Sequence, residues 1–128
     1  MERKRISERV IGCAFEVSNT LGSGFLEAVY ENALCIELSR QGLRFARQQP
    51  LQVRYKGEVV GHYVADLVVE DRLLVELKAL SALSSGHEAQ VMNYLRATGL
   101  SVALLLNFGT PKLRIRRIVW RHDDAIEL

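Results

Sequence analysis

Tyr63-Val-Ala-Asp-Leu-Val-Val-Glu-Asp-Arg-Leu-Leu-Val-Glu-Leu-Lys78 consists of two apolar runs on either side of the polar segment Glu70-Asp71-Arg72. The short polar segment has no helical pattern, so the stretch predicts two antiparallel strands joined by a tight hairpin. Each run carries charge where a buried strand should be apolar: Asp66 in the first run, and Glu76 and Lys78 in the second. A charge among strand residues is costly unless it is paired or binds a metal.

The length of the hairpin loop decides whether these charges meet. Side chains alternate along a strand, so Glu76 and Lys78 point to the same face. With a three-residue loop Asp66 lies opposite Glu76, and cross-strand partners on one face are about 5 Å apart. A two-residue loop would shift the register by one and put the two carboxylates on opposite faces. A metal site therefore requires an odd loop or a bulge, in a loop that lacks Gly or Asn for a left-handed position.

Asp, Glu and Lys in this order on adjacent strands can hold a divalent cation and activate a water beside a phosphate. The structural alternative is a salt-bridge cluster of Asp66, Glu76 and Lys78. The apolar setting of the three charges favours the metal site over the salt-bridge cluster.

The composition is that of an ordinary globular domain. The chain has 128 residues, 48% hydrophobic and 25% charged, enough for one domain over residues 1–128 and too few for two. No apolar run approaches the roughly 20 residues that cross a bilayer, and no signal-peptide apolar region follows the N-terminus, so we expect a cytoplasmic protein without membrane contact. Cys13 and Cys35 have no metal-ligand spacing and are predicted to be reduced, buried thiols.

The net charge of +2 is too small by itself to indicate nucleic acid. The basic residues are grouped, however, and such groups could meet phosphates, although a solvated surface explains any single one at least as well. They are Arg3, Lys4 and Arg5 at the start, Arg40, Arg44, Arg47 and Arg54 in the middle, and Lys112, Arg114, Arg116, Arg117 and Arg121 near the end. His62 and His122 have no evident partner and are predicted to be surface residues.

Hydrophobic periodicity predicts an α/β fold of the mixed α+β kind, in which helices pack on a mixed sheet. Helices are expected over about residues 7–19, 25–41 with Ser23 as its cap, and 87–98. Strands are expected at 45–48, 51–55, from 58 into the Asp66 run, at 73–78, 102–106 and 113–120. The run 102–106 is apolar throughout, which predicts a strand buried on both faces and reached by a crossover from the preceding helix.

Polar residues share one stripe of the second predicted helix: Glu27, Tyr30 and Glu31, with Leu34 alongside. Glu27 is either a third carboxylate of the site or a first-turn acid that favours the helix N-terminus.

The third predicted helix carries a similar stripe of His87, Gln90 and Tyr94. These side chains either contact phosphate and the attacking water or form a polar outer face with Tyr94 half buried. Because this helix follows the strand that carries Glu76 and Lys78, it can pack beside the acidic site.

Short motifs along nearly the whole chain resemble the GxxExxY proteins, a bacterial family of about this length. They are Gly24-Phe-Leu-Glu27-Ala-Val-Tyr30, Ala65-Asp66-Leu67, Val75-Glu-Leu-Lys78, His87-Glu-Ala-Gln-Val-Met-Asn-Tyr94, Ala97-Thr-Gly99 and Leu106-Asn-Phe-Gly109. That family is placed in the PD-(D/E)XK nuclease-like superfamily. The resemblance implies a restriction-endonuclease-like core with a mixed, four-stranded central sheet flanked by helices.

The resemblance also implies roles for individual residues. Asp66 and Glu76 would bind Mg²⁺, Lys78 would complete the site, and Glu27 would add an acid from the preceding helix, kept ionised by the helix dipole. One departure is Ala65, which stands where the superfamily pattern has Pro.

Gln90 and Tyr94 resemble the Q-x-x-x-Y element of an exonuclease branch tied to recombination helicases. This likeness favours a role for the third predicted helix in positioning the substrate.

The first functional hypothesis is a Mg²⁺- or Mn²⁺-dependent phosphodiesterase acting on DNA. Its metal ligands would be Glu27, Asp66, Glu76 and the Leu77 carbonyl, with Lys78 orienting the water and Gln90 and Tyr94 holding phosphate or nucleophile in line. The second is a nucleic-acid-binding module without catalysis. The third is a protein-interaction subunit that keeps its carboxylates as a salt-bridge cluster. The sequence does not fix the oligomeric state and is compatible with a homodimer or a place in a larger complex.

Overall fold

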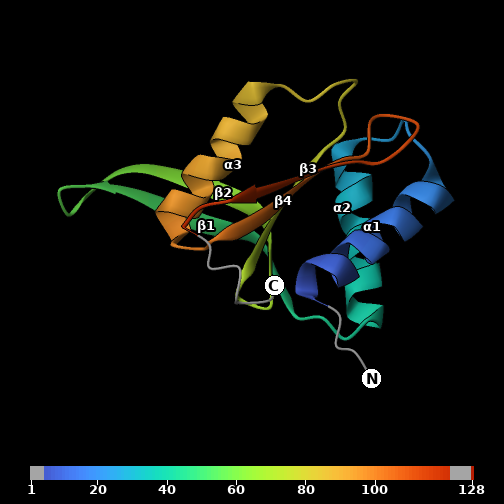
Figure 1. The fold of residues 1–128 in the computed structure, drawn as a ribbon, viewed down its shortest axis with the longest axis horizontal. Coiled ribbons are helices and arrows are strands. Elements are labelled where there is room, and N and C mark those ends of the chain that lie inside the picture. The colour runs from blue at the N-terminus through green and yellow to red at the C-terminus, as the bar shows by residue number, and fades with distance from the viewer. Residues whose placement is uncertain (1–4, 122–127) are drawn as a thin grey trace.

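The computed structural model describes residues 5–121 and 128, and these residues form three helices and five strands. In chain order the elements are α1 (Ile6–Leu21), α2 (Glu27–Arg40), β1 (Phe45–Tyr55), β2 (Glu58–Val69), β3 (Leu73–Lys78), α3 (Ser85–Thr98), β4 (Val102–Asn107) and β5 (Arg114–Val119). The strands make one sheet in the order β1-β2-β3-β4-β5, with β3 and β4 parallel and the other neighbours antiparallel. The predicted mixed α/β class is confirmed (Figure 1), although the described sheet has five strands where the resemblance implied four.

Helices cover both faces of the sheet. α1 and α2 pack on one face, against a core that includes Leu67, Val75 and Leu104. α3 packs on the other face, against Leu74 and Leu105. None of the described helices has both the length and the apolar composition needed to span a bilayer.

The crossover predicted around the third helix is present. β3 and β4 pair in parallel from Leu73↔Val102 to Lys78↔Asn107, and α3 connects them. All six residues of β4 are buried, because helices cover both faces of this interior strand.

The hairpin between β2 and β3 has the three-residue loop that brings the charges together. Val69 pairs with Leu73, which leaves residues 70–72 as the loop. Glu70 and Asp71 have φ angles of 53° and 57°, a left-handed conformation that Asp adopts more readily than Glu. Glu70 is held there because its backbone N–H donates to the Arg44 carbonyl at 2.9 Å and its Oε2 accepts from the Arg44 N–H at 2.7 Å. These tertiary hydrogen bonds stabilise the left-handed conformation that Gly or Asn would adopt readily in an isolated hairpin.

β1 is longer than the sequence predicted, because the short runs at 45–48 and 51–55 join into one strand. Pro50 is tolerated because β1 lies at the edge of the sheet, where a missing N–H leaves no ladder bond unmade. Gln48 has a φ of 48°, and β1 and β2 pack different faces against the helices before and after this point. Leu67 belongs to the core under α1 and α2, whereas Leu51 and Ala65 pack in the core beside α3.

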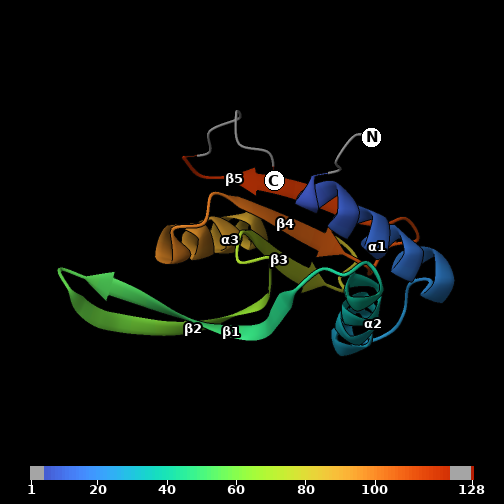
Figure 2. The same cartoon turned by 90° about the horizontal axis from the view of Figure 1, so that it is seen from below.

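We call residues 49–55 and 58–65 the arm. Figure 2 shows the arm extending past α3, away from α1 and α2. β2 pairs with β3 only from Leu67 to Val69, so the arm begins where β2 leaves β3.

Both cysteines are free and buried, as predicted. Burial raises the pKa of the Cys13 thiol and of the Cys35 thiol, which keeps them protonated and unreactive.

Candidate active site

The acidic pair lies at the point where β2 and β3 separate. Continuing the pairing of Leu67 with Val75 places Asp66 opposite Glu76. There the carboxylates replace backbone carbonyls as acceptors: the Asp66 N–H donates to Glu76 Oε1 at 3.0 Å, and the Leu77 N–H donates to Asp66 Oδ2 at 2.8 Å. Each carboxylate is fixed through one oxygen by a backbone donor and keeps a second oxygen for another ligand.

Among the described residues, no cationic side chain forms an ion pair with Asp66 or Glu76. Burial is the main cause that raises the pKa of Glu76 to about 9, and hydrogen bonding and charge from the Asp66 carboxylate raise it further. The Asp66 N–H and the Lys78 ammonium oppose this rise. Glu76 is only 5% exposed. Two carboxylates at such close range favour either a shared proton or a bound cation.

Lys78 stands two residues after Glu76 on the same strand face and is half-buried. Among the described residues it makes no ion pair with Asp66 or Glu76, although its charge lowers the pKa of Glu76 and of Glu27. The salt-bridge alternative required direct contact of the ammonium with these carboxylates, and the described ion pairs involve other residues.

The segment after Lys78 is clamped by residues to which sequence reasoning gave no role. The buried Asn107 amide exchanges two hydrogen bonds of 2.9 Å with the Leu80 backbone, and the Phe108 N–H donates to the Lys78 carbonyl at 2.8 Å. A Cβ on Gly109 would come within 2.3 Å of the Leu80 backbone, so this close approach requires glycine. The Leu106-Asn-Phe-Gly109 motif was the available signal, and its effect is to fix the end of β3.

Gly24 and Tyr30 of the motif Gly24-x-x-Glu27-x-x-Tyr30 shape the turn that precedes Glu27. Gly24 has a φ of 113°, which a side chain would disfavour. The Tyr30 hydroxyl donates to the Gly22 carbonyl at 2.6 Å and accepts from the Phe25 N–H at 3.2 Å. Tyr30 is fully buried and stacks on Phe108 with ring centroids 4.8 Å apart. The stack joins the turn before Glu27 to the clamp behind Lys78.

Glu27 is the first residue of α2, and the helix therefore begins two residues later than predicted. Ser23 is not the cap; Leu26 occupies that position without a side-chain hydrogen bond, because the Tyr30 hydroxyl already orders the turn. Partial desolvation and then the Asp66 charge raise the pKa of Glu27, which is opposite in direction to the effect expected of the helix dipole.

Glu27 is close enough to the acidic pair for the Asp66 charge to raise its pKa, but it does not complete a compact group of metal ligands with Asp66 and Glu76. In the part of the chain that the structure describes, no three carboxylate, imidazole or thiol side chains are gathered closely enough to hold a metal ion. The oxygen donors of Asp66 and Glu76 are of the kind that a hard divalent cation binds, and the raised pKa of Glu76 reflects its burial beside a second carboxylate.

Tyr94 on α3 packs in the buried cluster that contains Ala65, the residue directly before Asp66. Burial, and then the charges of Glu76 and Asp66, raise the pKa of Tyr94. Gln90 is exposed one turn earlier on the same face, where it lines a groove together with Tyr94. His87 has a structural part: its Nδ1 accepts from the Ser84 N–H at 3.0 Å in a capping box, so α3 begins at Ser85 rather than at residue 87.

Several basic residues have partners within the chain. Arg47 donates to Glu31 Oε2 at 2.8 Å and to Asn32 Oδ1 at 2.6 Å, and Gln48 donates to Glu31 Oε1 at 2.9 Å. The Glu31 hydrogen bond is the main cause that raises the pKa of Arg47. Glu31 is thus a satisfied buried acid that ties α2 to β1.

Arg44 pairs with Glu70 at 3.2 Å and Arg116 with Glu88 at 3.4 Å. His62 is exposed, as predicted. Arg3, Lys4 and His122 lie outside the described residues.

A family model described as the PD-(D/E)XK nuclease superfamily matches residues 4–118. The fold is similar to that in the crystal structure of SSO0001, with a TM-score of 0.60 and 16% sequence identity. That similarity covers 94% of this chain and 60% of the other, so this chain spans about 60% of the length of that protein. At this identity the likeness concerns the fold alone. No curated protein sequence matches the chain.

Proposed function

Because the chain belongs to the PD-(D/E)XK nuclease superfamily, we propose that it is a divalent-metal-dependent nuclease of the GxxExxY family that hydrolyses phosphodiester bonds in DNA. One observation carries the proposal: two carboxylates from adjacent strands are fixed by backbone N–H groups, and the pKa of one is raised to about 9. A buried acid that served only the fold would have a cation of the chain beside it, as Glu31 has.

Asp66 and Glu76 would hold Mg²⁺ or Mn²⁺, with Glu27 and the Leu77 carbonyl as further ligands. A cation bound there would lower the pKa of a water molecule and polarise the scissile phosphate. The Asp66 and Leu77 N–H groups hold the two carboxylates in place beforehand, so little reorganisation is needed when the site is filled.

The remaining residues act on the substrate. The Lys78 ammonium would orient the attacking water and offset charge that develops on the phosphoryl oxygens. Tyr94 and Gln90, one turn apart on α3, would position the phosphate. Phe108 and Asn107 are positioning residues, since they hold the backbone behind Lys78.

The test is cleavage of supercoiled plasmid and of labelled single-stranded DNA and RNA with Mg²⁺ or Mn²⁺. Lys78→Ala and Asp66→Asn should each lower the rate by about 10²–10³-fold, as loss of one electrostatic group does elsewhere. Lys112→Ala removes an exposed lysine elsewhere on the surface; it is the matched control and should cleave like the wild type. Equal rates in wild type, Lys78→Ala and Asp66→Asn would mean a contaminating nuclease. Faster cleavage of RNA than of DNA would correct the substrate.

A binding module without catalysis is the second candidate, and the absence of a closed three-ligand group among the described residues favours it. Calorimetric titration with Mn²⁺ separates the two functions. Heat of binding that disappears in Asp66→Asn supports the nuclease, whereas nucleic-acid binding without any cation binding supports the module.

A further inference from the structure

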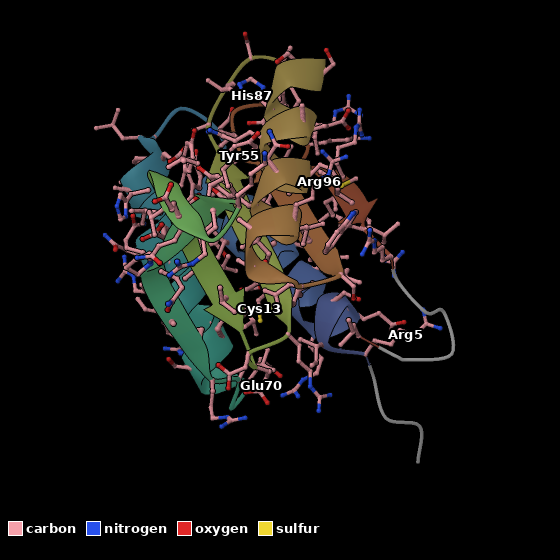
Figure 3. All side chains as sticks on the ribbon, turned by 90° about the vertical axis from the view of Figure 1, so that its left-hand side faces the viewer. Arg5, Cys13, Tyr55, Glu70, His87 and Arg96 are labelled. Carbon is pink, nitrogen blue, oxygen red and sulfur yellow. The ribbon has the colours of Figure 1, made fainter. Side chains whose placement is uncertain are left out.

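A groove of about 1360 Å³ runs between the arm and α3. One wall consists of arm residues of β1 and β2, and the other is the face of α3 that carries Gln90 and Tyr94. Figure 3 looks toward the arm, labelled at Tyr55, with α3 beside it, labelled at His87 and Arg96. We propose that this groove binds a single, unpaired strand of nucleic acid and leads it to the acidic pair. The inference rests on the proposed function and adds to it the form of the substrate.

The groove leads to the acids through Tyr94. Tyr94 lines the groove and packs in the same buried cluster as Ala65, the residue directly before Asp66. A strand lying along α3 would therefore bring its next phosphate to the carboxylates without leaving the protein surface.

Charge in the groove suits a phosphate backbone. Arg54 on the arm and Arg96 on α3 stand on opposite walls, and Asp71 is the acid among the lining residues. Arg54 donates to the Gly57 carbonyl and to Gln52 Oε1, and neither partner neutralises its charge. Within the described residues the Arg96 side chain makes no hydrogen bond or ion pair. Both guanidinium groups remain available for phosphates, unlike those of Arg44, Arg47 and Arg116.

Aromatic rings in the groove suit unpaired bases. Tyr63 is 48% exposed on the arm, and its ring lies 5.7 Å from that of the buried Tyr94, tilted by 50°. The Tyr94 ring supports one side of Tyr63 and leaves the rest open. Bases stack on such a platform when they are not paired, whereas the bases of a duplex already stack on each other.

The remaining polar groups do not select a sequence. Gln49, Gln90 and Asn93 line the groove, and no hydrogen bond of these amides to another described residue competes with a ligand. Amides at the sides of a basic, aromatic groove fit binding that depends on backbone and stacking more than on base identity.

The experiment measures fluorescence anisotropy of a labelled 20-nucleotide oligothymidylate and of a 20-base-pair duplex in EDTA, so that no cleavage occurs. Wild-type protein should bind the oligothymidylate at least about tenfold more tightly than the duplex. Tyr63→Leu should weaken binding of the oligothymidylate by about tenfold, within the range measured for loss of a stacking ring. Tyr63→Phe, which keeps the ring, should restore it.

Arg54→Ala and Arg96→Ala should each reduce the slope of log affinity against log salt by about 0.7, the value for one phosphate contact of a single strand. Arg117→Ala removes an exposed arginine of β5 outside the groove and should leave the slope unchanged. Duplex binding as tight as that of the oligothymidylate, no binding of either, or equal effects of Arg96→Ala and Arg117→Ala would overturn the inference.

Failure of the groove and failure of the nuclease are distinguishable. Metal-dependent cleavage that survives Arg54→Ala, Arg96→Ala and Tyr63→Leu would reject the groove alone. Binding of the oligothymidylate in EDTA with neither cation binding nor cleavage would reject the nuclease alone.

Discussion

Two buried glutamates of this molecule have opposite surroundings. Glu31 on α2 is 8% exposed, and Glu76 on β3 is 5% exposed. The Glu31 carboxylate accepts from the Arg47 guanidinium and the Gln48 amide, so its charge is neutralised within the chain. Glu76 accepts from a backbone N–H and faces another carboxylate, and its pKa rises to about 9. Two glutamates of similar burial therefore differ chemically, because the groups next to a buried carboxylate decide whether its charged form is stable.

The difference separates a structural acid from the proposed cation site. Removal of the Arg47 partner leaves the Glu31 charge unpaired in the low-dielectric interior, which destabilises the fold. Removal of charge from the acidic pair relieves repulsion and costs the fold little. The same class of substitution should therefore have opposite effects at the two places.

The largest expected effect concerns cation binding. In the wild type, Mn²⁺ at about 100 times its Kd should stabilise the fold by about 2.7 kcal/mol, because it binds the native state alone. Glu76→Gln should abolish this gain, since the amide cannot replace the carboxylate as an anionic ligand. Thermal melts with and without Mn²⁺ measure both. A full Mn²⁺ response in Glu76→Gln would show that the cation binds elsewhere.

Breaking the other acidic site should lower stability without any metal. Arg47→Met should cost about 2 kcal/mol, less than the 3–5 kcal/mol of a fully buried pair because the Arg47 side chain is 43% exposed. Asp66→Asn, by contrast, should leave the melting temperature of the metal-free protein unchanged or raise it. Urea denaturation compares the two, with Arg117→Met as a control. Equal losses in Arg47→Met and Asp66→Asn would remove the distinction between the sites.

The acidic pair should also make the metal-free protein depend on pH. The pKa of Glu76 is about 9 in the fold against an ordinary 4.5, so between these values the folded state binds more protons than the unfolded state. Stability should therefore fall as pH rises from about 4.5 toward 9, and the raised pKa of Glu27 acts in the same direction. Denaturant melts across this range should show a smaller decline in Glu76→Gln. A stability that rises with pH would contradict the raised pKa.

The smallest effect is expected at the exposed hairpin. Arg44 and Glu70 form an ion pair at the surface, and the Arg44 N–H and side chain lower the pKa of Glu70. Solvent screens this pair, so Glu70→Gln should shift the melting temperature less than Arg47→Met does. A larger shift would mean that the left-handed loop depends on the charge of Glu70 and not only on its hydrogen bonds.

The acidic pair could be predicted because it depends on short-range rules. Alternation along a strand and a three-residue loop are enough to bring Asp66 opposite Glu76. The loop itself was the uncertain part, since Glu70 takes its left-handed conformation only through hydrogen bonds to Arg44, 26 residues earlier. Local sequence does not contain that information.

The structural acid escaped prediction for the same reason. Glu31 meets Arg47 only because α2 lies across the start of β1, a matter of tertiary packing. Sequence reasoning saw Glu31 as one more polar residue of a stripe and Arg47 as a candidate for phosphates. The continuity of β1 through Pro50 was missed as well, because Pro is a strand breaker except at an edge, and edges are defined by the whole sheet.

The stacked rings of Tyr30 and Phe108 offer a way to sort homologous sequences. The Tyr30 ring shapes the turn before Glu27, and the Phe108 residue that it stacks on holds the backbone of Lys78. The two aromatic positions should therefore co-vary among homologues that keep their chemistry. A homologue that retains every acid but has lost both rings should be grouped with the degenerate copies, despite an intact signature.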